Sequence, residues 1–145
     1  MILKWRSLIV CLAMIVAVLL VSCAPVANTS MPINISCDDF QKQPNIVRDV
    51  ELTAGSSITV TLCSNKTTGF SWDENAQITD NQVIQQTSYK WVPPAESGKM
   101  GAPGNEVWNF KAMKQGKSTI SLAYSRPWQG GEKGVNTFKL NITVK

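Results

Sequence analysis

The sequence predicts an all-β fold, an immunoglobulin-like antiparallel β-sandwich of about seven strands. The first reason is that apolar and polar residues alternate along most of the chain after residue 45, whereas helical periodicity is absent. The second reason is that these alternating segments are short and are separated by stretches rich in Gly, Pro and Asn. The chain has 145 residues, 43% of them hydrophobic, which suits one domain with a proper core.

The predicted strands are recognised by β-branched and aromatic residues that share one face. Ile58, Val60 and Leu62 alternate with threonines in one of them. Trp72 and Trp108 lie in other alternating segments, so we expect both in the core rather than on the surface. The strands are predicted over residues 46–53, 57–63, from 70 onward, 82–92, 106–113, 117–125 and 136–144.

Residues 65–70, which we call the first loop, are typical of a tight and ordered connection. Asn65 tolerates left-handed backbone geometry, and Gly69 adopts positive φ at little steric cost. The side chains of Thr67 and Thr68 are short, so the backbone at this tip could enter a narrow cleft. An ordinary connection between two strands is the simpler interpretation of these residues taken alone.

Two further loops are long or unusual in composition. Residues 93–105, the middle loop, are dense in Gly and Pro and long for a compact domain, which indicates a function. Residues 126–134, the third loop, are Gly-rich and carry Trp128, which we expect to be exposed. Arg126 either contacts a binding partner of the protein or pairs with Glu132 in a surface ion pair.

The N-terminal segment is expected to direct export rather than to join the fold. Lys4 and Arg6 precede an apolar run that is too short for a membrane span of about 20 residues and suits a secretory signal. The run ends in Leu-Val-Ser-Cys at residues 20–23, which resembles the bacterial lipobox. Residues 1–22 are therefore predicted to be a lipoprotein signal peptide, with Cys23 as the lipidation site; a plain signal peptide or an uncleaved anchor is the alternative.

The rest of the chain is predicted to form a tether and one domain. Residues 23–36 contain Pro, Asn and Ser and are predicted to be the tether, and residues 37–145 the domain. We expect the protein to be exported and lipid-anchored at the cell envelope, with the membrane as one partner. Cleavage removes two of the 14 basic residues and none of the 10 acidic ones, and the remaining charge of about +2 does not predict nucleic-acid binding.

Cysteine usage agrees with export. Cys11 leaves with the signal and Cys23 takes the lipid, which leaves Cys37 and Cys63. An even remainder in an oxidising compartment predicts one disulfide, which would tie down the chain just before the first loop. Two free buried cysteines are the alternative.

Histidine is absent from the sequence. This excludes general acid–base catalysis by histidine, Ser-His and Cys-His nucleophiles, and the usual zinc sites that contain histidine. With both domain cysteines expected in a disulfide, no convincing pair of nucleophile and base remains. We therefore expect a protein that is not an enzyme and that needs no cofactor or metal. We also expect a monomer.

Three motifs stand in a fixed order along the chain. Residues 65–72 read Asn-Lys-Thr-Thr-Gly-Phe-Ser-Trp, residues 101–104 read Gly-Ala-Pro-Gly, and residues 126–128 read Arg-Pro-Trp. Together they resemble the chagasin family of cysteine-protease inhibitors, whose hallmarks are Asn-Pro-Thr-Thr-Gly-aromatic-x-Trp, a Gly-rich middle loop and an Arg-Pro-Trp loop before the last strand. Lys66 stands where the family usually has proline, which removes some preset rigidity from the first loop.

The resemblance implies a sandwich whose three loops gather at one end and reversibly block the active-site cleft of a papain-like cysteine protease. It places Thr67 and Thr68 nearest the catalytic cysteine, Arg126 and Trp128 beside the catalytic histidine, and the middle loop on the opposite side. A tight loop that presents no bond in attack geometry fills such a cleft without being cleaved. The residues that the resemblance assigns to protease contact are Asn65, Lys66, Thr67, Thr68, Gly69, Phe70, Gly101, Ala102, Pro103, Gly104, Arg126, Pro127 and Trp128.

A cell-surface adhesion or carbohydrate-binding module is the alternative function. Trp91 and Trp128 would then form a platform for a sugar, and this role needs neither Thr67 nor Gly69. A glycan array combined with a mutant at Thr67 and Thr68 would separate the two hypotheses.

Overall fold

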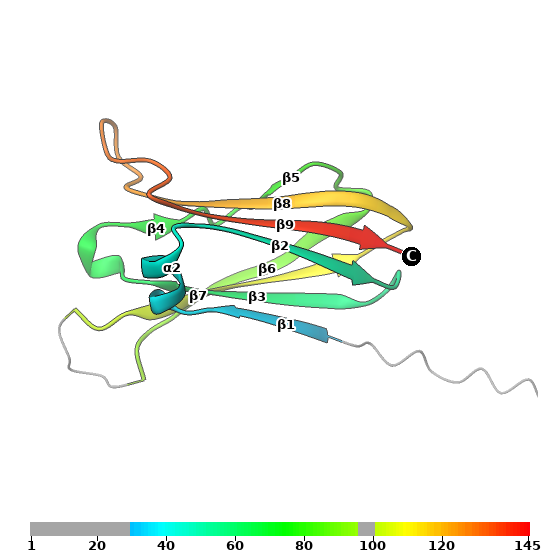
Figure 1. Cartoon of the computed structure of the whole chain (residues 1–145), viewed down its shortest axis with the longest axis horizontal. Helices are drawn as coiled ribbons and strands as arrows, with labels where there is room; N and C mark the ends of the chain where they lie inside the picture. Colours follow the sequence, from blue (N-terminus) through cyan, green and yellow to red (C-terminus); the bar gives the residue numbers. More distant parts are fainter. Residues whose placement is uncertain (1–29, 96–100) are drawn as a thin grey trace, which may run out of the picture.

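The structure is a computed structural model that describes residues 30–95 and 101–145. Its elements, in chain order, are β1 (Ser30–Ile35), α2 (Cys37–Lys42), β2 (Asn45–Leu52), β3 (Ser57–Ser64), the 3₁₀ turn η2 (Lys66–Thr68), β4 (Ser71–Trp72), β5 (Gln77–Ile78), β6 (Ile84–Val92), β7 (Gly104–Ala112), β8 (Gly116–Ser125) and β9 (Asn136–Val144). The strands form two facing sheets (Figure 1). One sheet has the order β1-β3-β7-β6, and the other has the order β2-β9-β8-β4, with β5 paired to β8.

The predicted all-β sandwich of immunoglobulin type is confirmed, with two differences in detail. The described residues contain nine strands rather than about seven, because the sequence pattern does not reveal β1 or the two-residue β5. The sheets are also not purely antiparallel, since β1 pairs with β3 and β2 pairs with β9 in parallel. Neither of these pairs is joined by a hairpin, so the connection does not impose antiparallel pairing on them.

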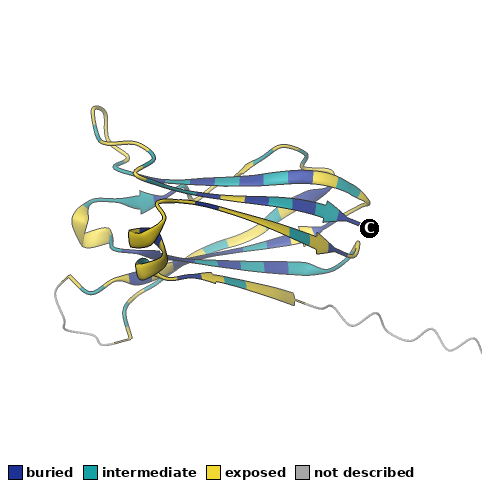
Figure 2. Cartoon of the chain, viewed as in Figure 1, coloured by how far each residue is buried: buried dark blue, intermediate teal, exposed yellow. Residues whose placement is uncertain are grey.

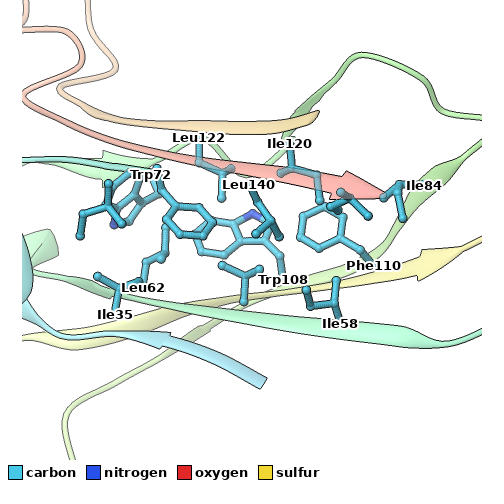
Figure 3. Close-up of a cluster of buried hydrophobic side chains, with 14 of the residues drawn as sticks. Ile35, Ile58, Leu62, Trp72, Ile84, Trp108, Phe110, Ile120, Leu122 and Leu140 are labelled. Carbon is cyan, nitrogen blue, oxygen red and sulfur yellow. The ribbon is translucent and has the colours of Figure 1, made fainter. Parts of the chain in front are cut away.

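The core lies between the two sheets and is built from the inward-facing residues of alternating strands. Burial alternates along the strands, while the connections are largely exposed (Figure 2). Trp72 and Trp108 are both buried, as predicted, and they lie among aliphatic side chains of both sheets (Figure 3). Each indole N–H is satisfied: Trp72 Nε1 donates to the carbonyl of Cys63 at 2.9 Å, and Trp108 Nε1 donates to the carbonyl of Glu74 at 3.1 Å.

The domain begins earlier than the sequence predicts. Composition predicts a tether over residues 30–36, yet β1 pairs with β3 along its whole length, from Ser30 opposite Ser57 to Ile35 opposite Leu62. Ile35 is buried in the core. The segment contains a proline, which is tolerated because β1 is an edge strand, and this residue hides the strand signal. The tether prediction is therefore wrong for residues 30–36, and the remainder of that tether lies outside the described residues.

The sequence pattern also does not predict the helix α2. Its N-terminus is a capping box, in which Ser36 Oγ accepts from Asp39 N at 3.2 Å and the Asp39 carboxylate accepts from Ser36 N at 2.8 Å. The hydrogen bonds from Ser36 hold the pKa of the Asp39 carboxyl below its ordinary value. A helix of six residues is too short to show periodicity, so only the Ser-x-x-Asp spacing could have indicated it.

Two interactions hold α2 against one end of the sandwich. The ring of Phe40 is buried, and its centroid lies 5.0 Å from that of Trp72. The predicted disulfide is present and joins Cys37, the first residue of α2, to Cys63 near the end of β3. Within the described residues, no helix is long and apolar enough to cross a membrane.

Candidate functional site

The first, middle and third loops gather at one end of the sandwich (Figure 1). They follow β3, β6 and β8, and these three strands all run toward that end. The helix α2 lies at the same end, whereas Ser30 at the start of β1 pairs near the opposite end. Residues 96–100 of the middle loop lie outside the described residues.

The first loop is a closed turn held by its own hydrogen bonds. The Asn65 side chain accepts from Thr67 N at 3.2 Å and from Thr67 Oγ1 at 2.6 Å. The Asn65 carbonyl accepts from Thr68 N at 3.1 Å and from Thr68 Oγ1 at 2.6 Å. Gly69 ends the turn in the left-handed region with φ 79°, which favours glycine. The threonine hydroxyls are therefore used to fix the backbone, while Thr67 and Thr68 themselves remain exposed.

Asn65 connects the first loop to the rest of the site. Its side-chain Nδ2 donates to the carbonyl of Gly101 at 2.9 Å, which links the first and middle loops. Its backbone N–H donates to the hydroxyl of Tyr124 at 2.9 Å, which links the loop to β8. The aromatic ring of Phe70 stacks on that of Tyr124 with centroids 5.4 Å apart, so the loop rests on an aromatic base.

The third loop lies against the first loop. A Cβ atom at Gly69 would come within 2.6 Å of Trp128 Cη2, so the indole occupies the space above this glycine. The guanidinium carbon of Arg126 lies 4.5 Å from the ring centroid of Phe70, a cation–π distance. Trp128 is nevertheless 51% exposed, as predicted, which leaves a large aromatic surface open at the end of the molecule.

Contacts inside the third loop fix its shape. Arg126 Nη1 pairs with Glu132 Oε2 at 3.1 Å, so the surface ion pair between these two residues does form. The backbone N–H of Arg126 also donates to the carbonyl of Glu132 at 2.8 Å. Lys133 Nζ donates to the carbonyl oxygens of Arg126 and Trp128. Arg126 therefore contacts both Glu132 in its own loop and Phe70 in the first loop.

The predicted contact residues differ in accessibility. Lys66, Thr67, Thr68, Gly101, Pro103, Pro127 and Trp128 are exposed, and Asn65, Gly69, Phe70, Ala102 and Arg126 are partly buried. Gly104, in contrast, is buried as the first residue of β7, where a Cβ atom would come within 2.6 Å of the indole of Trp91. Gly104 therefore supports the site from within. Cys23, the predicted lipidation site, lies outside the described residues.

Sequence reasoning missed two residues that support the site, Tyr124 and Glu106. Glu106 is fully buried in β7 directly below the first loop. The signal was its even spacing from Trp108 and Phe110, which places all three on the inward face of one strand. A charged residue at an inward position is unusual and indicates a specific partner.

A hollow of about 520 Å³ lies between α2 and the first loop. It is lined on one side by Phe40 and Gln41 of α2 and on the other by Asn65 and Thr68. Among the described residues, no group of His, Cys, Asp and Glu could hold a metal ion. Trp91, one half of the alternative sugar platform, is partly buried, with Gly104 against its ring and Lys66 Nζ 5.1 Å from its centroid.

Comparison with known proteins agrees with the loop motifs. A family model described as "Chagasin family peptidase inhibitor I42" matches residues 51–142. Amoebiasin-2 of Entamoeba histolytica is 31% identical over 88 residues, which cover 61% of this chain and 70% of that protein. Chagasin of Trypanosoma cruzi is 31% identical over 81 residues, which cover 54% of this chain and 73% of that protein.

Solved structures share the fold. The crystal structure of EhICP2, a cysteine protease inhibitor from Entamoeba histolytica, matches with a TM-score of 0.58 at 21% identity and covers 80% of this chain and 97% of that chain. PbICP-C, solved in complex with falcipain-2, matches with a TM-score of 0.52 at 17% identity and covers 81% and 99%. The family model spans more than half of the sequence, and the loops that carry the family motifs meet at one end of the fold. The chain therefore belongs to the chagasin family and is an inhibitor of cysteine proteases, not an enzyme.

Proposed function

We propose that the protein inhibits papain-like cysteine proteases reversibly by placing its three loops in and around the active-site cleft. The observation that carries this proposal is the contact between Gly69 and Trp128, together with the hydrogen bond from Asn65 to Gly101. These two contacts make one continuous surface from loops that are far apart in the sequence. A solved relative, PbICP-C, is in complex with falcipain-2, which supports a protease as the partner.

The geometry of the first loop suits an inhibitor rather than a substrate. A protease cleaves an extended segment that lies in attack geometry. Residues 66–68 instead form a 3₁₀ turn, in which Thr68 N donates to Asn65 O and Gly69 N donates to Lys66 O. Because this turn is ordered before binding, the cost of about 0.5–1.5 kcal/mol for each immobilised side chain is largely avoided.

Trp128 is the residue best suited to anchor the complex. Its indole is large, half-exposed and fixed from below by Gly69. Aromatic residues of this kind are common among the few positions that dominate binding energy. Pro127, next to it, restricts the backbone and so lowers the entropy that binding must remove.

The test is inhibition of papain by the purified chain. The wild-type protein should inhibit stoichiometrically and reversibly, and Thr68→Asp and Trp128→Ala should each raise the inhibition constant by at least about tenfold. Thr53→Asp and Met113→Ala are matched controls, because both positions are exposed and lie in turns away from the loops. Absence of inhibition across several papain-like enzymes at micromolar protein would refute the proposal.

We also propose that the protein is exported and held at the cell envelope by a lipid on Cys23, after removal of residues 1–22. The Cys37–Cys63 disulfide supports export, because such bonds persist in oxidising compartments. Incorporation of a labelled fatty acid that is lost in Cys23→Ala would test the anchor. We further propose a monomer, which light scattering of Cys23→Ala would test; a concentration-dependent dimer mass would exclude it.

A further inference from the structure

A buried carboxylate lies directly below the first loop. The side chain of Glu106 is fully excluded from solvent and is placed there by β7. Burying a charge is costly unless hydrogen bonds or an opposite charge compensate it. Each oxygen of Glu106 has such partners. A carboxylate is not needed to fill the core, so these partners indicate a specific structural role.

One oxygen of Glu106 binds both ends of the first loop. Oε1 accepts from Ser64 Oγ at 2.7 Å and from Trp72 N at 3.1 Å. Ser64 is the residue immediately before the loop, and Trp72 follows it in β4. A single carboxylate oxygen therefore fixes the distance between the two points at which the loop leaves and rejoins the sandwich.

The other oxygen faces a tyrosine and a lysine. Tyr89 Oη donates to Glu106 Oε2 at 2.6 Å. Burial and this hydrogen bond raise the pKa of Tyr89 well above its ordinary value, so the hydroxyl stays protonated as a donor. Lys66 Nζ lies 3.3 Å from Tyr89 Oη and 4.0 Å from Glu106 Oε2.

Lys66 is thus directed back toward the sheet although it belongs to the loop. Its ammonium lies 5.1 Å from the ring centroid of Trp91 and 5.9 Å from that of Tyr89. The side chain is 36% exposed, so it is more than half covered by these contacts. A lysine in this position anchors the start of the turn to β6 and β7 instead of reaching outward.

We propose that Glu106 and Lys66 are positioning residues that hold the first loop in its binding geometry, and that Lys66 is not a contact residue for the protease. The proposal rests on the proposed function, because the geometry that it preserves is that of the inhibitory tip. Glu106 fixes the ends of the loop, and Lys66 fixes its first residue. Preorganisation of this kind acts mainly on the dissociation rate of the complex, because a loosened loop still enters the cleft but leaves it sooner.

Substitutions at Lys66 give the sharpest test, because this residue is at the surface and its loss leaves the core intact. Lys66→Met keeps the unbranched shape and most of the length of the side chain and removes the ammonium charge. Lys66→Pro removes the anchor but fixes φ at the first position of η2, where proline is well tolerated. Asn65, with φ −118° and ψ 88°, lies outside the helical region that a following proline disfavours. Lys90→Met is the matched control, since Lys90 is an exposed residue of β6 outside the loops.

The expected result concerns the rates of association and dissociation with papain, measured with the full-length chain. Lys66→Met should raise the dissociation rate by about fivefold or more while the association rate changes less than about twofold. Lys66→Pro should recover most of this loss, and Lys90→Met should match the wild type. A dissociation rate for Lys66→Met equal to that of the wild type would overturn the proposal, as would failure of Lys66→Pro to restore it. A loss confined to the association rate would also overturn it, because that result would show electrostatic steering of the encounter by the ammonium charge rather than a loosened loop.

Amide hydrogen exchange separates this proposal from the proposed function. The amides of Thr68 and Gly69 donate to Asn65 O and Lys66 O at 3.1 Å each, so they report on the turn in the free protein. Their exchange should be faster in Lys66→Met than in the wild type, and unchanged in Lys90→Met. If the wild type did not inhibit papain but this difference was present, the proposed function would fail and the positioning role would stand. Equal exchange in Lys66→Met and wild type would reject the positioning role whatever the inhibition.

Discussion

The indole of Trp128 covers Gly69 so closely that a methyl group on residue 69 would lie 2.6 Å from Cη2 and 3.2 Å from Cζ3 of the ring. Glycine is required here for two reasons. The indole leaves no room for a methyl group, and residue 69 also has φ 79°, which favours glycine. The first and third loops, separated by more than fifty residues of sequence, are therefore fitted to each other through the absence of one side chain. This contact joins the two loops into one surface at the end of the sandwich.

Gly69→Ala should weaken inhibition more than it destabilises the fold. The added methyl must displace Trp128, so we expect the inhibition constant for papain to rise by at least about tenfold. The left-handed backbone should cost about 1 kcal/mol of unfolding free energy. Gly55→Ala is the control, because Gly55 has φ 89° and open space around it in the turn between β2 and β3. Both variants should lose similar stability in urea unfolding, and equal losses of inhibition would contradict this explanation.

Removal of the disulfide should loosen the N-terminal part of the domain. Cys37 and Cys63 are separated by 26 residues, and closing such a loop stabilises a protein by about 2–4 kcal/mol. Cys37→Ser with Cys63→Ser should show this loss in urea unfolding, and the wild type in excess dithiothreitol should reproduce it. If neither treatment moves the midpoint, β1 and α2 are held by pairing and packing alone. Papain is assayed with a thiol reductant, so the oxidation state of the inhibitor must be checked in the same experiment.

The strands and loops of the binding end could be predicted because their signals are local. Thr67, Thr68 and Gly69 carry their geometry in four or five consecutive residues, and the alternation around Ile58 and Trp108 identifies the sheets directly. The relation between Glu106 and the ends of the first loop could not be predicted. It depends on the register of β7 against β3 and β6, which a single strand pattern does not reveal.

Stability should fall at high pH because of Tyr89. Its pKa is raised in the folded protein, first by burial and then by the hydrogen bond to Glu106, whereas in the unfolded chain it ionises near its ordinary value of about 10. The contribution is therefore fully present below about pH 10 and is lost as the pH rises beyond that value. Urea unfolding of the wild type between about pH 8 and about pH 11 should show a steeper decline than that of Tyr89→Phe. Parallel curves for the two proteins would show that Tyr89 is not the titrating group.

The ion pair between Arg126 and Glu132 should matter little. Both side chains are exposed enough for solvent to screen them, and such pairs contribute about 0–1 kcal/mol. Glu132→Gln should therefore change the unfolding free energy by less than about 0.5 kcal/mol and leave inhibition of papain within about threefold. Arg126→Ala, which also removes the group stacked on Phe70, should weaken inhibition clearly more. Equal effects of the two substitutions would show that Glu132 is what positions Arg126.

The N-terminal strand β1 and the helix α2 also could not be predicted from the sequence. β1 contains a proline and exposed residues on an edge, and α2 is a capped helix of only six residues, so composition alone resembles a linker. β1 is held by the edge of β3 and α2 by the ring of Trp72, and both partners lie further along the chain. Tertiary contacts of this kind override weak local preferences.

Ser30 lies beside Ser57, at the start of β3, and the eight residues of that strand then run toward the first loop. At about 3.3 Å per residue, roughly 25 Å of sheet separates this point from the first loop. Anything joined upstream of Ser30, whether a membrane or a fusion partner, is thus attached near the end of the sandwich that lies opposite the three loops. The protein can therefore be immobilised at this end while the end that carries the loops stays accessible.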